Sequence, residues 1–187
     1  RATPGAEIRI LGEDGSPAPA GVAGEIVGRS GTLMTGYRAA PERTEEAVWR
    51  DGTGHVFIRT GDMGRLDEDG YLTLLDRKKD MIISGGENVY PAQVESAIYG
   101  HPAVGEVAVI GVPDDTWGEA VKACVVAKPG SAVDAEDIIS FTRERLAGFK
   151  VPKTVDVIPE MPRNASGKIL RRELRAPYWE GRDRQVN

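Results

Sequence analysis

The sequence is poor in the residues that build metal centres and disulfides. It has one cysteine and two histidines among 187 residues. A single cysteine excludes an internal disulfide and a cysteine-based metal site, and two histidines are too few for a histidine metal cluster. Cys124 lies in the strand-like run KACVVAK, which favours a packed, buried thiol over a reactive one. We therefore expect no metal site in this chain.

Long apolar runs and clustered positive charge are also missing. No stretch is apolar over the length that a membrane-spanning helix needs, and no charged-then-apolar leader is visible. The formal charge of −5 at pH 7 argues against a general affinity for nucleic acid. These features predict a globular, cytoplasmic protein without a transmembrane segment. The chain starts at Arg1 in a stretch that already reads as a strand, so we expect it to be a piece of a longer protein.

Two regions of the sequence differ in their pattern. Residues 1–76 hold short β-like runs between Gly, Pro and Asp turns, such as DEDG at 67–70. Residues 77–187 mix helical and strand patterns. We predict an α+β fold, with an antiparallel β subdomain over 1–76 and a small mixed α+β C-terminal domain over 77–187. The second domain should have a short central sheet and flanking helices, and the joint near DRKKD at 76–80 should be a short hinge.

Start and stop signals locate the elements of the second region. Pro91 can open a helix that Gly100 ends. The β-branched runs at 106–112 and 121–127 predict strands. Asp134 is the predicted N-cap of a helix whose buried apolar side chains extend to Leu146. LRRELR at 170–175 predicts a last short helix.

The segment PRNASGKILRR at 162–172 presents Lys168 after a small, turn-prone run. An ammonium group on such a flexible loop can reach a neighbouring site and neutralise charge on an attacking oxygen or a phosphate. Taken alone, a solvated surface lysine is the more ordinary interpretation. A phosphate-loop NTPase is excluded, because the GxxxxGK pattern needs Gly where Pro162 stands and Ser or Thr where Ile169 stands.

Two further segments allow more than one interpretation. IRTGD at 58–62 ends a predicted strand and offers Asp62 at a turn, either to accept hydrogen bonds from a ribose diol or simply to cap the turn. DRKKDMIISGGENVYP at 76–91 contains adjacent glycines, which let a thin ligand approach the backbone closely or make an ordinary tight turn. The residues alone do not separate these alternatives.

Taken together, four segments occur in one order at fitting spacings. They are GEIVGRSGTLMTGYRAAPERT (24–44), IRTGD, DRKKDMIISGGENVYPAQVE (76–95) and PRNASGK. This series resembles the adenylate-forming superfamily, which includes acyl-CoA synthetases, peptide-synthetase adenylation domains and firefly luciferase. The resemblance covers essentially residues 1–176. The sequence KKDMIISGGENVYPAQVE is typical of the acyl-CoA synthetases, so the chain resembles the C-terminal part of a fatty-acid–CoA ligase-like enzyme.

The resemblance implies an acid–thiol ligase that works in two half-reactions. A carboxylic acid attacks the α-phosphate of Mg-ATP and gives an acyl-adenylate and pyrophosphate. The thiol of coenzyme A then attacks the adenylate and releases AMP. ATP/AMP with Mg and coenzyme A are thus the implied cofactor and co-substrate. A mobile C-terminal domain, here starting near residue 77, rotates between the two halves against the N-terminal domain of the same protein.

The family's nucleotide and hinge roles carry over to four positions. Asp62 matches the aspartate that binds the ribose hydroxyls, and Arg77 matches an arginine that also approaches the ribose. Lys79 matches the hinge. Lys168 matches the lysine needed for adenylation, and relatives also use this lysine for reversible acetylation, so a lysine acetyltransferase is an implied partner.

The implied coenzyme A contacts lie in three segments. Gly85 and Gly86, with the turn around Glu87, match the segment that lines the pantetheine tunnel. Other positions match residues near bound coenzyme A in some members: Trp117, Phe149 and Lys153. One departure is Val151, where some relatives have a second basic residue, so Lys150 or Lys153 must make the nucleotide contact.

Two family segments are missing from the sequence. There is no Ser/Thr/Gly-rich phosphate loop and no aromatic-Gly-x-Thr-Glu segment for adenine and magnesium. The resemblance places both, the Mg ligands and the acyl pocket upstream of Arg1, so we expect this chain alone to be inactive in adenylation. A fatty acid is the first choice of substrate and an aryl acid the second. Two alternatives remain: an adenylation domain that loads a carrier protein, and a stand-alone coenzyme A binding module.

Overall fold

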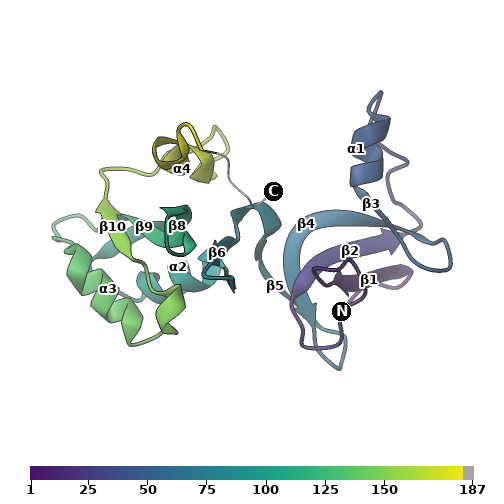
Figure 1. The fold of residues 1–187 in the computed structure, drawn as a ribbon, viewed down its shortest axis with the longest axis horizontal. Coiled ribbons are helices and arrows are strands. Elements are labelled where there is room, and N and C mark those ends of the chain that lie inside the picture. The colour runs from purple at the N-terminus through teal and green to yellow at the C-terminus, as the bar shows by residue number, and fades with distance from the viewer. Residues whose placement is uncertain (183–187) are drawn as a thin grey trace. The chain divides into compact units, whose positions relative to one another are not determined.

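The computed structural model describes residues 1–182 and divides into two compact units. The first is Arg1–Lys78 and the second begins at Lys79. Each unit is built on a five-stranded sheet (Figure 1). Residues 183–187, the end of the predicted 77–187 domain, lie outside the described residues. The two units are described separately below.

The first unit is an antiparallel sheet with one short helix. Its strands run in the order β1-β2-β4-β3, and β5 pairs with β4. The predicted DEDG turn joins β4 to β5, where Asp67 and Tyr71 close the hairpin with a backbone bond of 3.1 Å. The antiparallel β architecture predicted for this region is confirmed. Its elements are β1 (Ala6–Leu11), β2 (Gly24–Ser30), α1 (Pro41–Glu46), β3 (Val48–Arg50), β4 (Val56–Leu66) and β5 (Leu72–Arg77).

The second unit is a mixed sheet with helices on both faces. Its strands run in the order β10-β9-β6-β7, with β8 on β9, and only the β10–β9 pair is parallel. This is the predicted α+β fold with a short central sheet and flanking helices. Its elements are η1 (Lys78–Asp80, a 3-10 turn that starts at the end of the first unit), β6 (Ile82–Ser84), β7 (Glu87–Val89), α2 (Pro91–Tyr99), β8 (Val104–Asp114), β9 (Gly118–Ala127), α3 (Ala135–Arg143), η2 (Gly148–Lys150), β10 (Thr154–Val157) and α4 (Arg171–Trp179).

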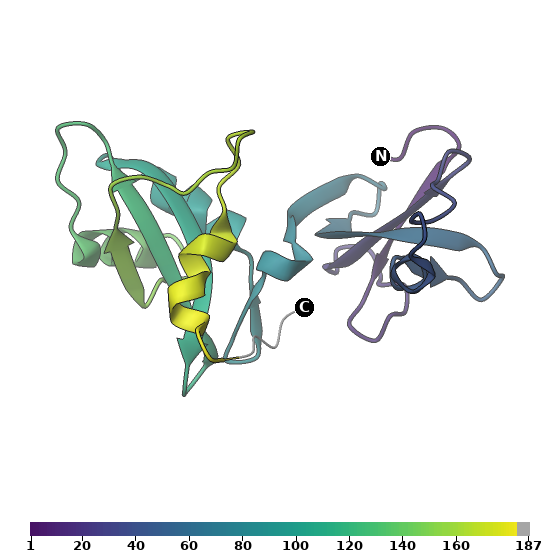
Figure 2. The ribbon, with the colours of Figure 1, turned by 90° about the horizontal axis from the view of Figure 1, so that it is seen from above.

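Alternating side chains of β8 give the second unit two cores. Val107 and Val109 pack with residues of α2 and α3, whereas Ala108 and Ile110 pack on the face that α4 covers. Successive side chains of a strand point to opposite faces, so a strand that is apolar throughout needs helices on both sides. Figures 1 and 2 show this arrangement, with α4 on one side of the sheet and α2 and α3 on the other.

The predicted helices are present, with one difference in extent. α2 begins at Pro91 and ends at the C-cap Gly100, as predicted. α3 begins after Asp134, but the Asp134 side chain makes no capping bond. The prediction that this helix carries Leu146 is wrong, because α3 ends at Arg143. Leu146 still packs against the core from the following turn.

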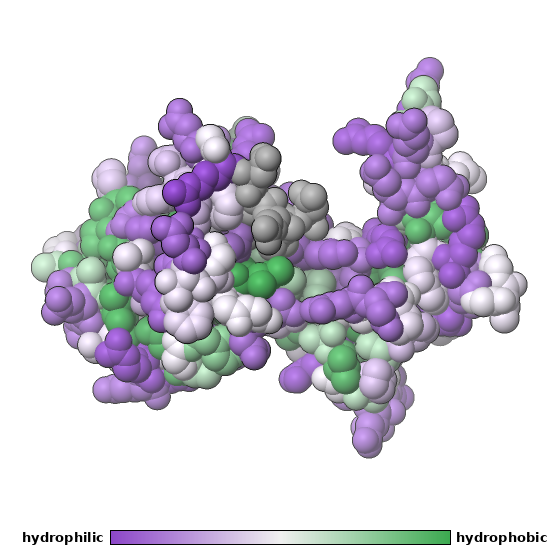
Figure 3. Space-filling view, in the orientation of Figure 1, coloured by the Kyte–Doolittle hydropathy of each residue, from purple (hydrophilic) through white to green (hydrophobic). Residues whose placement is uncertain are grey.

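One face of the molecule is seen in the space-filling view. Hydrophilic residues dominate the face seen in Figure 3, with apolar residues in smaller areas. No helix within residues 1–182 is long and apolar enough to cross a membrane.

The core of the second unit allows a test of its stability with neighbouring residues of α2. Ile98 is fully buried and Tyr99 is 49% exposed. We expect Ile98→Ala to lower the free energy of unfolding by about 2–5 kcal/mol, because it leaves a cavity against the sheet. Tyr99→Ala should stay within about 0.5 kcal/mol, as surface changes do. Urea unfolding followed by circular dichroism measures both. Equal losses would show that α2 does not pack as described.

Candidate functional site

Asp62 and Arg77 lie opposite each other on paired strands. The backbone register places them across β4 and β5, and Arg77 Nε lies 2.9 Å from Asp62 Oδ1. The prediction that the strand ends in a turn at Asp62 is wrong. Gly61 has φ of +71°, but β4 continues to Leu66 because β5 pairs with it to that residue and β2 pairs with it as far as Gly64. The Arg77 side chain is 56% exposed, so the pair is worth little to stability. It leaves a carboxylate and a guanidinium together at the surface.

The residues on either side of Lys79 are held by different units. Lys78 Nζ lies 3.0 Å from Glu25 Oε2 in β2 of the first unit. Asp80 is 7% exposed and lies 3.2 Å from Arg175 Nη2 of α4 in the second unit. Lys79 itself lies in η1, and its carbonyl accepts a long hydrogen bond of 3.4 Å from Arg175. The chain therefore changes from one set of anchors to the other at Lys79.

The double glycine forms the tight turn between β6 and β7. Gly85 and Gly86 have φ of +62° and +83°, values that suit a two-residue hairpin turn and that glycine adopts without strain. A Cβ on Gly85 would lie 2.6 Å from the Trp117 ring, whereas a Cβ on Gly86 would meet nothing within 4 Å. Glu87 follows as the exposed first residue of β7. The turn is thus packed on one side and open at Gly86.

Trp117 is held against this turn by its neighbours. Its carbonyl accepts a 2.9 Å bond from the Gly85 amide. The Asp114 carboxylate accepts bonds of 2.9 Å from the amides of Thr116 and Trp117 and so fixes the turn between β8 and β9. The Lys153 ammonium lies 5.4 Å from the centroid of the Trp117 ring. Three predicted residues from distant segments, Gly85, Trp117 and Lys153, therefore meet on one surface.

Phe149 and Lys150 lie in η2, which contacts β7. Lys150 Nζ lies 5.4 Å from the Phe149 ring centroid and donates a 2.8 Å bond to Gln93 of α2. Val151 is 5% exposed, so this position packs into the interior and offers no basic group. Of the two lysines considered at this turn, Lys153 is the one next to the Gly85–Trp117 contact.

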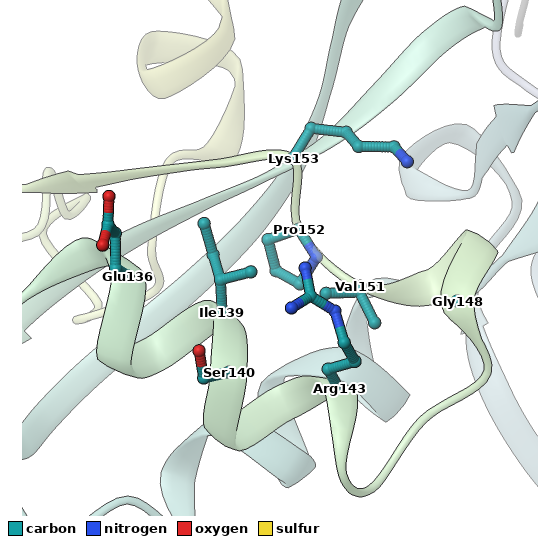
Figure 4. Close-up of a pocket in the computed structure, with 8 residues that line it drawn as sticks. All are labelled: Glu136, Ile139, Ser140, Arg143, Gly148, Val151, Pro152 and Lys153. Carbon is teal, nitrogen blue, oxygen red and sulfur yellow. The ribbon is translucent and has the colours of Figure 1, made fainter.

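A pocket of about 480 Å³ lies between α3 and the segment that follows η2. Figure 4 shows Arg143 of α3 beside Val151 and Pro152, while the Lys153 side chain extends away from α3. Ser140 and Glu136 line the pocket from the same helix. Two cations therefore border this surface, one on α3 and one at Lys153.

Lys168 lies at the end of a tight, bonded loop rather than a flexible one. The Asn164 side-chain oxygen accepts bonds from Ser166 and from the Lys168 amide, the latter at 2.9 Å, and the Asn164 amide donates to the Lys168 carbonyl at 3.0 Å. Gly167 has φ of +82°. The Lys168 side chain is exposed and makes no hydrogen bond or ion pair with any residue from 1 to 182. The loop thus fixes the backbone and leaves the ammonium available.

Cys124 is a packing residue, as predicted. It is 3% exposed and lies in the core beneath α4. Burial raises the pKa of its thiol to about 11, and the nearby Asp156 carboxylate adds to the effect. The thiol therefore stays protonated near neutral pH and is a poor nucleophile.

Several residues that support these positions were not singled out from the sequence. Asn164 carries a recognisable signal, since Asn followed by Ser two residues later often forms a side-chain-capped turn. Asp114 before Thr116 has the same kind of signal. Arg163 and Arg175 carry none, because their partners lie far away in the sequence.

Comparison with known proteins finds a matching family domain and similar ligases. Residues 93–168 match the AMP-binding enzyme C-terminal domain. A feruloyl-CoA synthase from Amycolatopsis sp is 50% identical over 172 residues, 92% of this chain and 34% of the relative. The fatty acid–acyl-carrier-protein ligase ScoC of Streptomyces coeruleorubidus is 44% identical over 184 residues, 98% of this chain and 34% of the relative.

A solved structure is similar over nearly the whole chain. The crystal structure of ATP-bound MatB from Rhodopseudomonas palustris superposes with a TM-score of 0.85 at 39% identity, over 95% of this chain and 35% of that one. The chain thus spans about a third of the length of these relatives.

The double-glycine turn gives a test with two matched variants. An alanine with positive φ costs about 1–2 kcal/mol at either position, but only Gly85→Ala also presses on the Trp117 ring. We expect Gly86→Ala to lower the free energy of unfolding by the strain energy alone. Gly85→Ala should lower it further and should also alter the near-UV circular dichroism. Chemical unfolding and near-UV spectra measure this. Indistinguishable stabilities and spectra would contradict the packing of Trp117 on Gly85.

Proposed function

Because this chain belongs to the adenylate-forming acyl-CoA synthetase family, of which it is the C-terminal part, we propose that it serves an ATP-dependent acid–thiol ligase that makes acyl-CoA through an acyl-adenylate. The half-reaction with coenzyme A is supported by the position of Gly85, Trp117 and Lys153 together on one surface. The adenylation half-reaction is supported by the ion pair of Asp62 with Arg77.

In the first half-reaction a carboxylate oxygen attacks the α-phosphorus of ATP. The bond from phosphorus to the bridging oxygen breaks and pyrophosphate leaves. We assign to Asp62 the acceptance of hydrogen bonds from the ribose hydroxyls, with Arg77 holding the carboxylate in place. Lys168 supplies positive charge to the oxygens on which negative charge gathers, which lowers the barrier when the cation is already positioned. The magnesium ion that accompanies ATP is assigned to residues outside this chain.

In the second half-reaction the thiol sulfur attacks the acyl carbonyl carbon and AMP leaves. The proposal places the pantetheine arm along the turn of Gly85, Gly86 and Glu87. Gly86 suits this role because nothing lies within 4 Å of where its Cβ would be, so a thin chain can approach the backbone. Trp117 offers an apolar wall, and Lys153 and Phe149 a cation and an aromatic ring for the nucleotide end of coenzyme A.

A carrier-protein thiol is the second candidate acceptor. The 44% identity to a fatty acid–acyl-carrier-protein ligase favours it. The two acceptors share the pantetheine arm, and only coenzyme A has a phosphorylated nucleotide. The Lys153 cation should therefore contribute to the reaction with coenzyme A and contribute little to the reaction with a carrier protein. We favour coenzyme A because the exposed Lys153 lies beside the predicted pantetheine surface.

The acid remains the least constrained part of the proposal. We keep a fatty acid as the first choice and an aryl acid as the second. The named relatives include both kinds, a feruloyl-CoA synthase and a fatty-acid ligase. The acyl pocket is assigned to residues outside this chain.

We also propose reversible acetylation of Lys168 by a lysine acetyltransferase. Its side chain is exposed and unpaired among residues 1–182, so an acylating enzyme can reach it. Acetylation removes the charge. The modified protein would then behave as a Lys168 variant without the cation.

Separate assays of the two half-reactions test the role of Lys168 in the full-length protein. We expect Lys168→Ala to slow acid-dependent pyrophosphate exchange by about 10²–10³, because one preorganised charge is lost. Thioester formation from preformed acyl-adenylate should change little. Lys168→Arg, which keeps the charge, should lose less, and the 187-residue chain alone should stay at background. Equal losses in both half-reactions would exclude the proposed role.

Lys79 allows a test of the hinge. A proline fixes φ at about −65°, close to the value of a 3-10 turn, and constrains Lys78 before it. We expect Lys79→Pro in the full-length protein to keep adenylation and to lose most thioester formation, because the backbone at Lys79 can no longer change between the half-reactions. Lys79→Ala removes the charge only and should be mild in both.

Thermal melting separates this effect from unfolding. The Lys79→Pro variant should melt close to the parent protein. A Pro variant that unfolds, or one with the same half-reaction profile as the Ala variant, would remove support for the hinge at this residue.

A further inference from the structure

The loop that carries Lys168 is closed by bonds between its two ends. Asn164 binds both backbone groups of Lys168, and Arg163 forms an isolated bridge with Ile169. These bonds set the shape of the loop. They do not attach it to the sheet, because every partner lies within the loop itself.

Ile169, next to Lys168, packs against the core beneath α4, and the Arg163 side chain adds a polar attachment. Its Nη1 donates a 2.6 Å bond to the Gly167 carbonyl, and its Nη2 forms an ion pair with the Glu106 carboxylate. Glu106 lies in β8, where its backbone pairs with Val126 of β9. One planar guanidinium thus joins the loop to the central strands through two nitrogens held at a fixed spacing, which the single ammonium nitrogen of lysine does not offer.

The bond to Gly167 acts on the peptide that directly precedes Lys168. Gly167 has φ of +82°, and a Cβ there would meet nothing within 4 Å. Glycine has a wide choice of backbone angles, so this peptide depends on its hydrogen bonds, one from Arg163 to the Gly167 carbonyl and one from the Lys168 amide to Asn164. Its carbonyl is also the one directly before Lys168. Rotation of this peptide would turn the Lys168 backbone and carry the ammonium with it.

We propose that Arg163 and Glu106 are positioning residues for Lys168. Neither touches the reacting atoms. Glu106 orients Arg163, Arg163 fixes the Gly167 peptide, and this sets the point from which the lysine side chain extends. The inference rests on the proposed role of Lys168 in adenylation. The side chains of Arg163 and Glu106 are 42% and 37% exposed, so loss of their ion pair should change the free energy of unfolding little. The main effect should be on the position of Lys168.

The test compares Arg163→Met and Glu106→Gln in the full-length ligase. We expect pyrophosphate exchange to fall by about tenfold in kcat, with little change in the KM for ATP, because a small displacement of a catalytic group is costly. Thioester formation from preformed acyl-adenylate should stay within about twofold. Arg163→Lys, whose ammonium does not span both contacts as the guanidinium does, should show an intermediate rate of pyrophosphate exchange.

Arg172→Met is the control. It removes an exposed cation from the start of α4 and should leave both half-reactions unchanged.

Amide hydrogen exchange provides a measurement that does not depend on catalysis. The amides of residues 164–168 should exchange faster in Arg163→Met and Glu106→Gln, while β8 and β9 keep their protection and the melting temperature stays the same. Unchanged exchange in the loop would overturn the attachment, whatever Lys168 does. Faster exchange with full adenylation would overturn the positioning role. If Lys168→Ala itself retains adenylation, the proposed function of Lys168 fails, and the exchange result still decides whether Arg163 holds the loop.

Discussion

The pairing of β8 with β9 is the constraint on which the second unit depends. The two strands are apolar on both faces, so they require helices on both sides, and those helices fix the chain segments that connect them. α4 can cover its face only if the chain crosses from β10 past the edge of the sheet, and the Lys168 loop lies in that crossing. The turn between β8 and β9 carries Trp117, and β8 carries Glu106. A change in the register of this pair would move all three candidate positions together.

Short polar contacts, rather than regular elements, place the candidate residues. Asp114 holds the turn that presents Trp117, and Asn164 holds the one that presents Lys168. In both, a side-chain oxygen accepts backbone amides that no strand or helix would satisfy. Both candidate side chains then extend from a fixed backbone without being buried. This combination suits groups that must meet a ligand, because the ordering of the backbone precedes binding.

Sequence patterns predicted the elements better than the contacts between them. Pro91 and Gly100 correctly marked α2, since both act through local backbone angles. The strand through Asp62 was placed too short, because Gly61 signals a turn and pairing with β2 and β5 carries β4 past it. The Arg163–Glu106 contact joins residues 57 apart in the sequence. No local signal specifies such a contact, because it exists only once β8 and the loop are folded. The Lys168 loop was predicted as flexible for the same reason.

The anchors around Lys79 support the hinge that we propose at this residue. Lys78 is bound to Glu25 and Asp80 to Arg175, so rotation about either neighbour would break an ion pair. Rotation about the Lys79 backbone keeps both ion pairs, although it displaces the Lys79 carbonyl that accepts a 3.4 Å bond from Arg175. A glycine- or serine-rich linker would distribute the motion over many residues and allow many orientations. A joint confined to one residue restricts the motion to one pair of backbone angles, which suits the alternation between a few orientations that we propose for this domain.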